Sequence, residues 1–178
     1  MLLTIFSLRK HNIMTLKASL KSKTHTVFIK KSAATRTIRK KTNGADIFLG
    51  AIVTIFGESN LYDIDMAGED EPIFGVVSGR ADDATNLDND KDTPFATNIN
   101  VMVTIPVPGD VFYCTTKQNT TITYGFALQV DGGFVENSQF EAANTVTNNI
   151  PPWGIIGIAL ESSTHVTSKE ECIQVMKV

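Results

Sequence analysis

Apolar and polar residues alternate with a period of two along much of this chain, and the alternating runs are short. The clearest run is Asn100 to Val107, in which Val101, Val103, Ile105 and Val107 are separated by polar or less apolar residues. Successive side chains of a strand point to opposite faces, so this run would place its four β-branched residues on one face. The pattern predicts half-buried β-strands rather than amphipathic helices, whose period is 3.6.

Turn-forming residues separate these runs. Gly50 interrupts the predicted strand Ile47–Phe56 and predicts a kink or bulge there. The sequence Pro108-Gly109-Asp110 predicts a turn, and Asp131-Gly132-Gly133 predicts a tight hairpin turn, because glycine readily adopts the positive φ that such turns need. The other predicted strands are Leu61–Met66, Ile73–Ser78, Asn100–Val107, Val111–Thr116, Thr121–Val130, Phe134–Glu136, Gly154–Glu161 and Cys172–Val178.

About eight short strands with frequent turns predict an all-β fold, a compact small barrel or sandwich. Helix is scarce, and the only short candidates are Ala81–Leu87 and Ser168–Glu171. The chain of 178 residues has the size of one domain, for which a single core is expected. No stretch approaches the roughly 20 apolar residues that span a bilayer, so we expect no membrane insertion.

The charge distribution divides the chain in two. Eleven of the sixteen basic residues and none of the nineteen acidic residues lie in residues 1–43, which therefore carry +11. Residues 44–178 hold five basic and nineteen acidic residues and carry −14. We therefore predict a basic, extended N-terminal arm at 1–43 and a β-barrel domain at 44–178. Such asymmetry predicts a charged partner for the arm, although a solvated, disordered tail is the alternative.

Two further features concern the chain's compartment. The apolar run Met1–Leu8 is short and is followed rather than preceded by basic residues, so it does not predict a secretion signal. Met14 offers a second start site, and the need for residues 1–13 is left open. The two cysteines, Cys114 and Cys172, lie in apolar runs and are expected to be free, buried thiols.

The search for catalytic motifs predicts no enzyme, no cofactor and no catalytic residues. The three histidines are scattered and no Cys/His spacing suits zinc, so no metal site of that kind is expected. The loop Asp82–Asp92 has acidic residues at EF-hand spacing, but Thr93 and Ile99 stand where glycine and a bidentate glutamate are needed. A solvated loop is the favoured interpretation, with a weak cation site left open.

Two other groups of residues keep alternatives open. An acidic patch would serve a small enzyme acting on sugars or peptides, although an exposed turn is favoured; it consists of Asp63, Asp65, Glu69, Asp70 and Glu71. Trp153, the only tryptophan, would either cap a barrel end or anchor a partner.

The basic arm itself allows two interpretations. Its bases could neutralise phosphates of a nucleic acid, but with Phe6 and Phe28 as its only aromatic residues it would stack few bases. Alternatively, the β-branched segments Thr26–Ile29 and Thr35–Ile38 could add strands to a neighbouring sheet edge, with charge attraction to an acidic surface. The predicted partner-binding residues are Lys17, Lys21, Lys23, Val27, Phe28, Ile29, Lys30, Lys31, Arg36, Ile38, Arg39, Lys40 and Lys41.

The layout of glycine-centred turns and strands over residues 43–178 resembles that of tailed-phage head decoration proteins, also called cement proteins. These small β-rich proteins sit on the outside of capsids, commonly as trimers, and clamp capsid subunits with an N-terminal arm. The segments that carry the resemblance are Asn43–Asp46, Leu49–Val53, Ile73–Val77, Val107–Val111, Gly125, Asp131–Val135 and Gly157–Glu161.

The resemblance implies a structural virion protein that binds the outer surface of an assembled capsid and stabilises it, with the arm strapping neighbouring subunits. The expected partners are the major capsid protein and further copies of this chain, with a trimer favoured. The implied location is the capsid surface of the virion, and the host cytoplasm during assembly. The alternatives are a nucleic-acid-binding protein that uses the arm, and a small carbohydrate- or receptor-binding virion protein.

Overall fold

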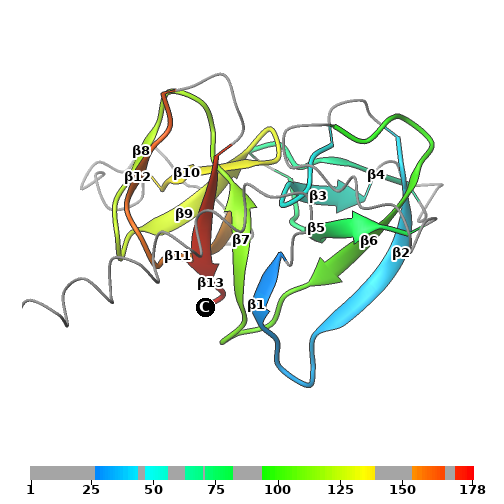
Figure 1. Cartoon of the computed structure of the whole chain (residues 1–178), viewed down its shortest axis with the longest axis horizontal. Helices are drawn as coiled ribbons and strands as arrows, with labels where there is room; N and C mark the ends of the chain where they lie inside the picture. Colours follow the sequence, from blue (N-terminus) through cyan, green and yellow to red (C-terminus); the bar gives the residue numbers. More distant parts are fainter. Residues whose placement is uncertain are drawn as a thin grey trace, which may run out of the picture.

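The computed structural model describes residues 27–43, 47–55, 63–69, 71–81, 94–138, 154–166 and 171–178. These residues form thirteen strands and no α-helix, which confirms the prediction of an all-β fold (Figure 1). No helix in these ranges is long and apolar enough to cross a bilayer. The strands are β1 (Phe28–Lys30), β2 (Arg36–Thr42), β3 (Ile52–Ile55), β4 (Asp63–Met66), β5 (Gly75–Arg80), β6 (Asn100–Ile105), β7 (Val111–Thr115), β8 (Thr121–Ile122), β9 (Ala127–Asp131), β10 (Phe134–Asn137), β11 (Ile155–Ala159), β12 (Ser163–Thr164) and β13 (Cys172–Met176).

Five consecutive strands close into a barrel in the order β2-β4-β3-β5-β6. The period-two pattern of β6 explains its place, because Val101 and Val103 point into the barrel and are fully buried. Glycine is required at Gly75 on β5, since a Cβ atom there would lie 2.7 Å from a methyl group of Val103. The barrel interior is a cluster of small and β-branched side chains: Ile47, Ala51, Val53, Ile64, Val77, Val101 and Val103.

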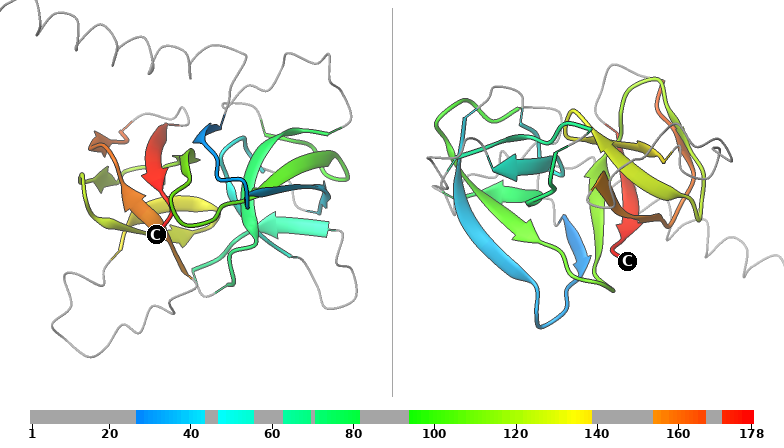
Figure 2. Two further views of the ribbon diagram at one scale, coloured as in Figure 1. Left: turned by 90° about the horizontal axis from the view of Figure 1, so that it is seen from below. Right: turned by 180° about the vertical axis from the view of Figure 1, so that it is seen from behind.

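The remaining strands form a six-stranded sheet in the order β1-β7-β13-β11-β9-β10 and a small two-stranded sheet of β12 and β8. Barrel and sheet lie side by side, as the views in Figures 1 and 2 agree. The hairpin of β9 and β10 turns at Gly132 and Gly133, both with positive φ, as predicted. The kink predicted at Gly50 is also confirmed, by its φ of 83°.

The sheet has a buried cluster of its own, in which Phe112, Leu128 and Ile156 are fully buried. Leu49, Ile52 and Val76 from the barrel side of the molecule belong to the same cluster. The described residues therefore contain two apolar clusters rather than the single core expected. The second one joins barrel and sheet, so the two units are packed together and not merely tethered.

The boundary of the predicted arm is wrong. Residues 28–42 form β1 and β2, which pair antiparallel with β7 and β6 of the same chain rather than with a neighbour. Their β-branched residues favour strands, and a strand at the surface can hold many charges on its solvated side. Because these residues are strongly basic, their sequence resembles that of a solvated arm rather than that of two strands of the fold. Residues 1–26 lie outside the described residues.

Thirteen strands replace the eight or so predicted, partly because Thr121–Val130 is two strands separated by a turn at Gly125, with φ of 82°. The loop Asp82–Asp92 and Trp153 lie outside the described residues, as does most of both helix candidates.

Cys114 and Cys172 are free thiols on the paired strands β7 and β13. Cys114 is fully buried, whereas Cys172 is partly exposed. Burial, with a smaller contribution from Cys172, raises the pKa of the Cys114 thiol well above its usual range.

Because the thiolate is the reactive species, we expect N-ethylmaleimide at neutral pH to alkylate Cys172 first, and Cys114 only on unfolding. Peptide mass mapping after timed quenching measures this order, and equal rates in the folded protein would contradict it.

Candidate partner-binding surface

Six cations lie on one continuous segment of the surface, residues 30–41, which we call the basic limb. It comprises the end of β1, the following loop and nearly all of β2, and residues 27–43 contain no acidic residue. Lys30, Lys31, Arg36 and Arg39 are exposed, and Lys40 and Lys41 are half-buried. Two large apolar side chains of the predicted partner-binding set are also exposed in this region, Ile29 by 45% and Ile38 by 39%.

The limb is fixed to the body by the carboxylate of Asp110, which is fully buried in the turn between β6 and β7. Its Oδ1 accepts a hydrogen bond from the Ser32 backbone N–H at 2.6 Å, and its Oδ2 accepts one from Thr35 Oγ1 at 2.6 Å. The Val107 N–H donates to Oδ2 at 3.0 Å. One side chain therefore joins the limb's loop to a turn more than seventy residues away.

These interactions set the protonation of Asp110. Burial raises its pKa, but the hydrogen bonds from Thr35, Val107 and Ser32, together with the charge of Lys31, outweigh burial. The net effect lowers the pKa from its usual value of 3.8, so the carboxylate is charged at neutral pH.

Two cation–π contacts hold lysines of the limb over aromatic rings. The ammonium of Lys31 lies 5.0 Å from the centre of the Phe28 ring, which stacks on Phe112. The ammonium of Lys40 lies 5.0 Å from the centre of the Phe74 ring. Both distances are within the range in which ring and cation attract.

The predicted binding residues therefore divide into three groups. Val27 and Phe28 are 3% and 5% exposed, so their side chains pack in the core and do not lie on the surface of the limb. Lys17, Lys21 and Lys23 lie outside the described residues. The structure brings the others together on the basic limb and on the adjoining Ile29: Ile29, Lys30, Lys31, Arg36, Ile38, Arg39, Lys40 and Lys41.

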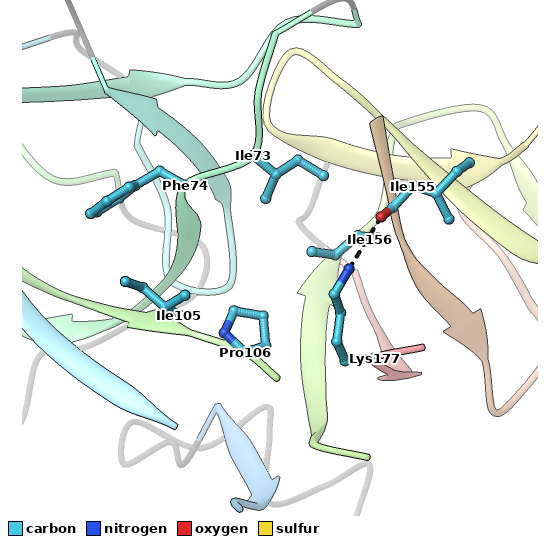
Figure 3. A pocket seen from close by; sticks show the side chains of 7 residues that line it. All are labelled: Ile73, Phe74, Ile105, Pro106, Ile155, Ile156 and Lys177. Carbon is cyan, nitrogen blue, oxygen red and sulfur yellow. Dashed lines mark hydrogen bonds between the residues drawn. The ribbon is translucent and has the colours of Figure 1, made fainter. Parts of the chain in front are cut away.

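An apolar pocket lies between barrel and sheet, beside the limb (Figure 3). Its volume is about 190 Å³, and we call it the Lys177 pocket after the one charged side chain in its wall. Lys177 Nζ donates to the Ile155 carbonyl at 3.4 Å, and burial lowers the pKa of Lys177. Sequence patterns missed this pocket because its walls come from segments far apart in the chain: Ile73, Phe74, Ile105, Pro106, Ile155, Ile156 and Lys177.

A second, more open depression of about 420 Å³ lies where two turns meet, at Asn119 and Gly132. Its charged groups are already paired, since Lys117 hydrogen bonds with Asp131 and lies 3.1 Å from Glu136 Oε2. The hydrogen bond with Asp131 is the main cause of the raised pKa of Lys117. The two charged side chains that line this depression, Lys117 and Asp131, are thus paired with each other.

The acidic patch makes local structural contacts. Asp65 Oδ1 accepts the Met66 N–H at 2.8 Å, and Glu71 Oε2 accepts the Gly68 N–H at 2.8 Å, as residues of turns and strand ends commonly do. Within the described ranges, no three acidic, histidine or cysteine side chains lie close enough together to hold a metal ion.

No protein-family model and no curated protein matches this chain. Among solved structures, it is similar to the crystal structure of the head fiber gp8.5 N base of bacteriophage phi29, with a TM-score of 0.53. The match covers 81% of this chain and 94% of that chain at 9% sequence identity. The chain therefore shares the overall fold of the base of a phage head fiber.

Proposed function

We propose that this protein is a structural component of a bacteriophage virion that attaches to the outer surface of the phage head. The observation that carries the proposal is the extent of the fold similarity, which spans 94% of a phage head fiber base. The glycine-turn layout independently resembles head decoration proteins, which occupy the same surface. Both comparisons concern structural proteins of the phage head.

The basic limb is the proposed contact with the head. Six cations on residues 30–41 favour an acidic surface, and hydrogen bonds to Asp110 fasten the loop between β1 and β2 to the body. A limb that is already ordered loses less conformational entropy on docking than a disordered arm would. The acidic partner surface is assigned to the major capsid protein, and residues 1–26 would extend the strap to a neighbouring subunit.

On this proposal, binding also stabilises the head. A protein that binds only the assembled shell shifts the assembly equilibrium toward the shell by mass action. The copies are proposed to form trimers on the head surface. Sedimentation equilibrium of the purified protein measures the number of copies, and a monomer at micromolar concentration would exclude a preformed trimer.

The test is co-sedimentation with emptied phage heads that lack the protein. In the limb variant, Lys30, Lys31, Arg36 and Arg39 are all changed to Gln. We expect its affinity for heads to fall at least about tenfold, because several charge pairs at an interface are lost together. The matched control makes the same change in net charge at exposed positions on or just after β8 and β12, which lie away from β1 and β2 (Figure 1): Thr121→Glu, Thr123→Glu, Tyr124→Glu and Val166→Glu. Equal binding by the limb and control variants would exclude the limb as the contact.

The N-terminal strap is tested separately by deleting residues 1–26. Deletion must stop there, because a cut at residue 43 would also remove β1 and the barrel strand β2. If the shortened protein binds heads as well as the full chain does, residues 1–26 are not a strap.

Nucleic-acid binding is the second candidate, favoured only by the density of cations on the limb. With Phe28 buried, the described part of the limb has no exposed ring on which a base could stack. Binding would then be almost purely electrostatic and would fall by about 10³ to 10⁵ between 50 and 200 mM salt if 6–10 phosphates are contacted. Tight binding of duplex DNA with this salt dependence, together with no binding to heads, would favour this candidate.

A further inference from the structure

The Lys177 pocket and the basic limb form one continuous surface. Arg36 on β2 lies directly opposite Ile105 on β6, and Ile105 lines the pocket. Lys40 on β2 places its ammonium over the ring of Phe74, which also lines the pocket. Figure 3 shows β2 passing beside Ile105 and Pro106. A partner that binds the limb therefore meets the pocket at its edge.

The size and lining of the pocket suit one apolar side chain. Cavities of about 150 Å³ with apolar walls hold a group as large as benzene, and this one measures about 190 Å³. Six of its seven lining residues are apolar. A single leucine, methionine or phenylalanine side chain would displace water from these walls, a pattern typical of the anchor residues of protein interfaces.

Lys177, the charged residue in the pocket wall, favours a negatively charged group next to the apolar side chain. Lys177 reaches its ammonium to the Ile155 carbonyl at 3.4 Å, a long hydrogen bond, and the ammonium has three donors in all. Its partly desolvated charge would gain more from a carboxylate than a fully hydrated lysine would. Arg36 and Lys40 extend the same positive field along the limb.

We propose that the Lys177 pocket is the socket for one apolar side chain of an acidic segment of the head protein, whose carboxylates contact Lys177 and the basic limb. The inference rests on the proposed function and adds the chemistry of the partner's contact segment. In such an arrangement the charges attract and orient the acidic segment, and the apolar side chain in the socket slows its release.

The test uses a blocked peptide, Asp-Glu-Phe-Glu-Asp, and protein labelled with ¹³C at isoleucine δ1 methyl groups. We expect saturable shifts of the methyl signals of Ile73, Ile105, Ile155 and Ile156. The peptide Asp-Glu-Ala-Glu-Asp should bind at least about tenfold more weakly, because it buries no large apolar group. The uncharged peptide Ser-Gln-Phe-Gln-Ser should also bind more weakly, because it lacks the carboxylates.

Two variants and two controls locate the binding on the protein. Ile73→Phe should fill the socket and abolish the preference for phenylalanine over alanine in the peptide, whereas Val166→Phe, at an exposed site outside both the socket and the basic limb, should not. Lys177→Met should weaken the phenylalanine peptide by about three- to tenfold. Lys117→Met removes a lysine that belongs to neither the pocket lining nor the basic limb, and it should leave the affinity for the phenylalanine peptide unchanged.

The other outcomes overturn the inference. Equal binding of the phenylalanine and alanine peptides would mean that the charges bind alone and the socket is not used. Methyl shifts that grow with protein concentration, without peptide, would assign the socket to a second copy of this chain. If Ile73→Phe still binds phage heads as the unaltered protein does, the socket is excluded while head attachment stands.

Discussion

Replacing Asp110 with alanine is expected to lower the free energy of unfolding by about 2 to 4 kcal/mol, because hydrogen bonds to a buried charged group each contribute about 1.5 to 3 kcal/mol. The change leaves the N–H groups of Ser32 and Val107 and the hydroxyl of Thr35 without their acceptor. Chemical denaturation followed by circular dichroism measures the loss. The control is Ser32→Ala in the loop between β1 and β2. This change keeps the hydrogen bond from the backbone N–H of residue 32 to Asp110, so it should lower the free energy of unfolding by less than about 1 kcal/mol.

The same side chain predicts a dependence on pH. Its folded-state pKa lies below its value in the unfolded chain, so the carboxylate stabilises the fold fully above about pH 4. That contribution is lost as the pH falls through the lowered folded-state pKa. Asp110→Asn should therefore lose less stability than the unaltered protein between neutral pH and pH 3. Parallel acid-denaturation curves for the two proteins would contradict this assignment.

Gly157→Ala is expected to destabilise the protein by about 3 kcal/mol, the upper part of the usual range for overpacking. A Cβ atom at this position on β11 would collide with the backbone carbonyl oxygen of Met176 on β13 and approach Val175 Cγ1 to 2.7 Å. Backbone in the middle of a sheet cannot move aside as the end of a flexible side chain can. Thermal unfolding followed by circular dichroism measures the effect.

Gly68→Ala is the matched control. A Cβ atom there would lie 3.5 Å from atoms of Glu71, an ordinary contact, so the cost should stay below about 1 kcal/mol. Similar melting temperatures for the two variants would show that β11 and β13 can separate slightly, and that the close approach at Gly157 is not a constraint on the sheet.

Local patterns predicted a strand well where the alternation of apolar and polar residues within that strand indicates which of its side chains are buried. Val101 and Val103 alternate with the more exposed Asn100 and Met102, and Gly132 and Gly133 stand where the hairpin needs positive φ. The basic segment was misassigned for the opposite reason. Its charges are typical of an unfolded arm, and the partner strands that order it, β6 and β7, lie far along the chain.

The candidate site was harder to predict because its key contacts are long-range. Asp110 was recognised only as part of a Pro-Gly-Asp turn, and nothing nearby in the sequence indicates that Ser32 and Thr35 are its partners. The walls of the Lys177 pocket come from the end of β6, from the two residues before β5, from β11 and from the residue after β13. A pocket of this kind exists only once barrel and sheet are packed together.

The order of the strands also bears on how such a protein could arise and be altered. The chain leaves the six-stranded sheet after β1, builds the whole barrel from β2 to β6, and returns to the sheet at β7 beside the strand it left. The barrel is thus a continuous insertion, and Asp110 joins its two connections to the sheet. Insertions with adjacent ends are readily gained, exchanged or enlarged without disturbing the host sheet. Related proteins could therefore keep the sheet and differ mainly in the module carried at this point, provided that the module supplies the apolar face now formed by Leu49, Ile52 and Val76.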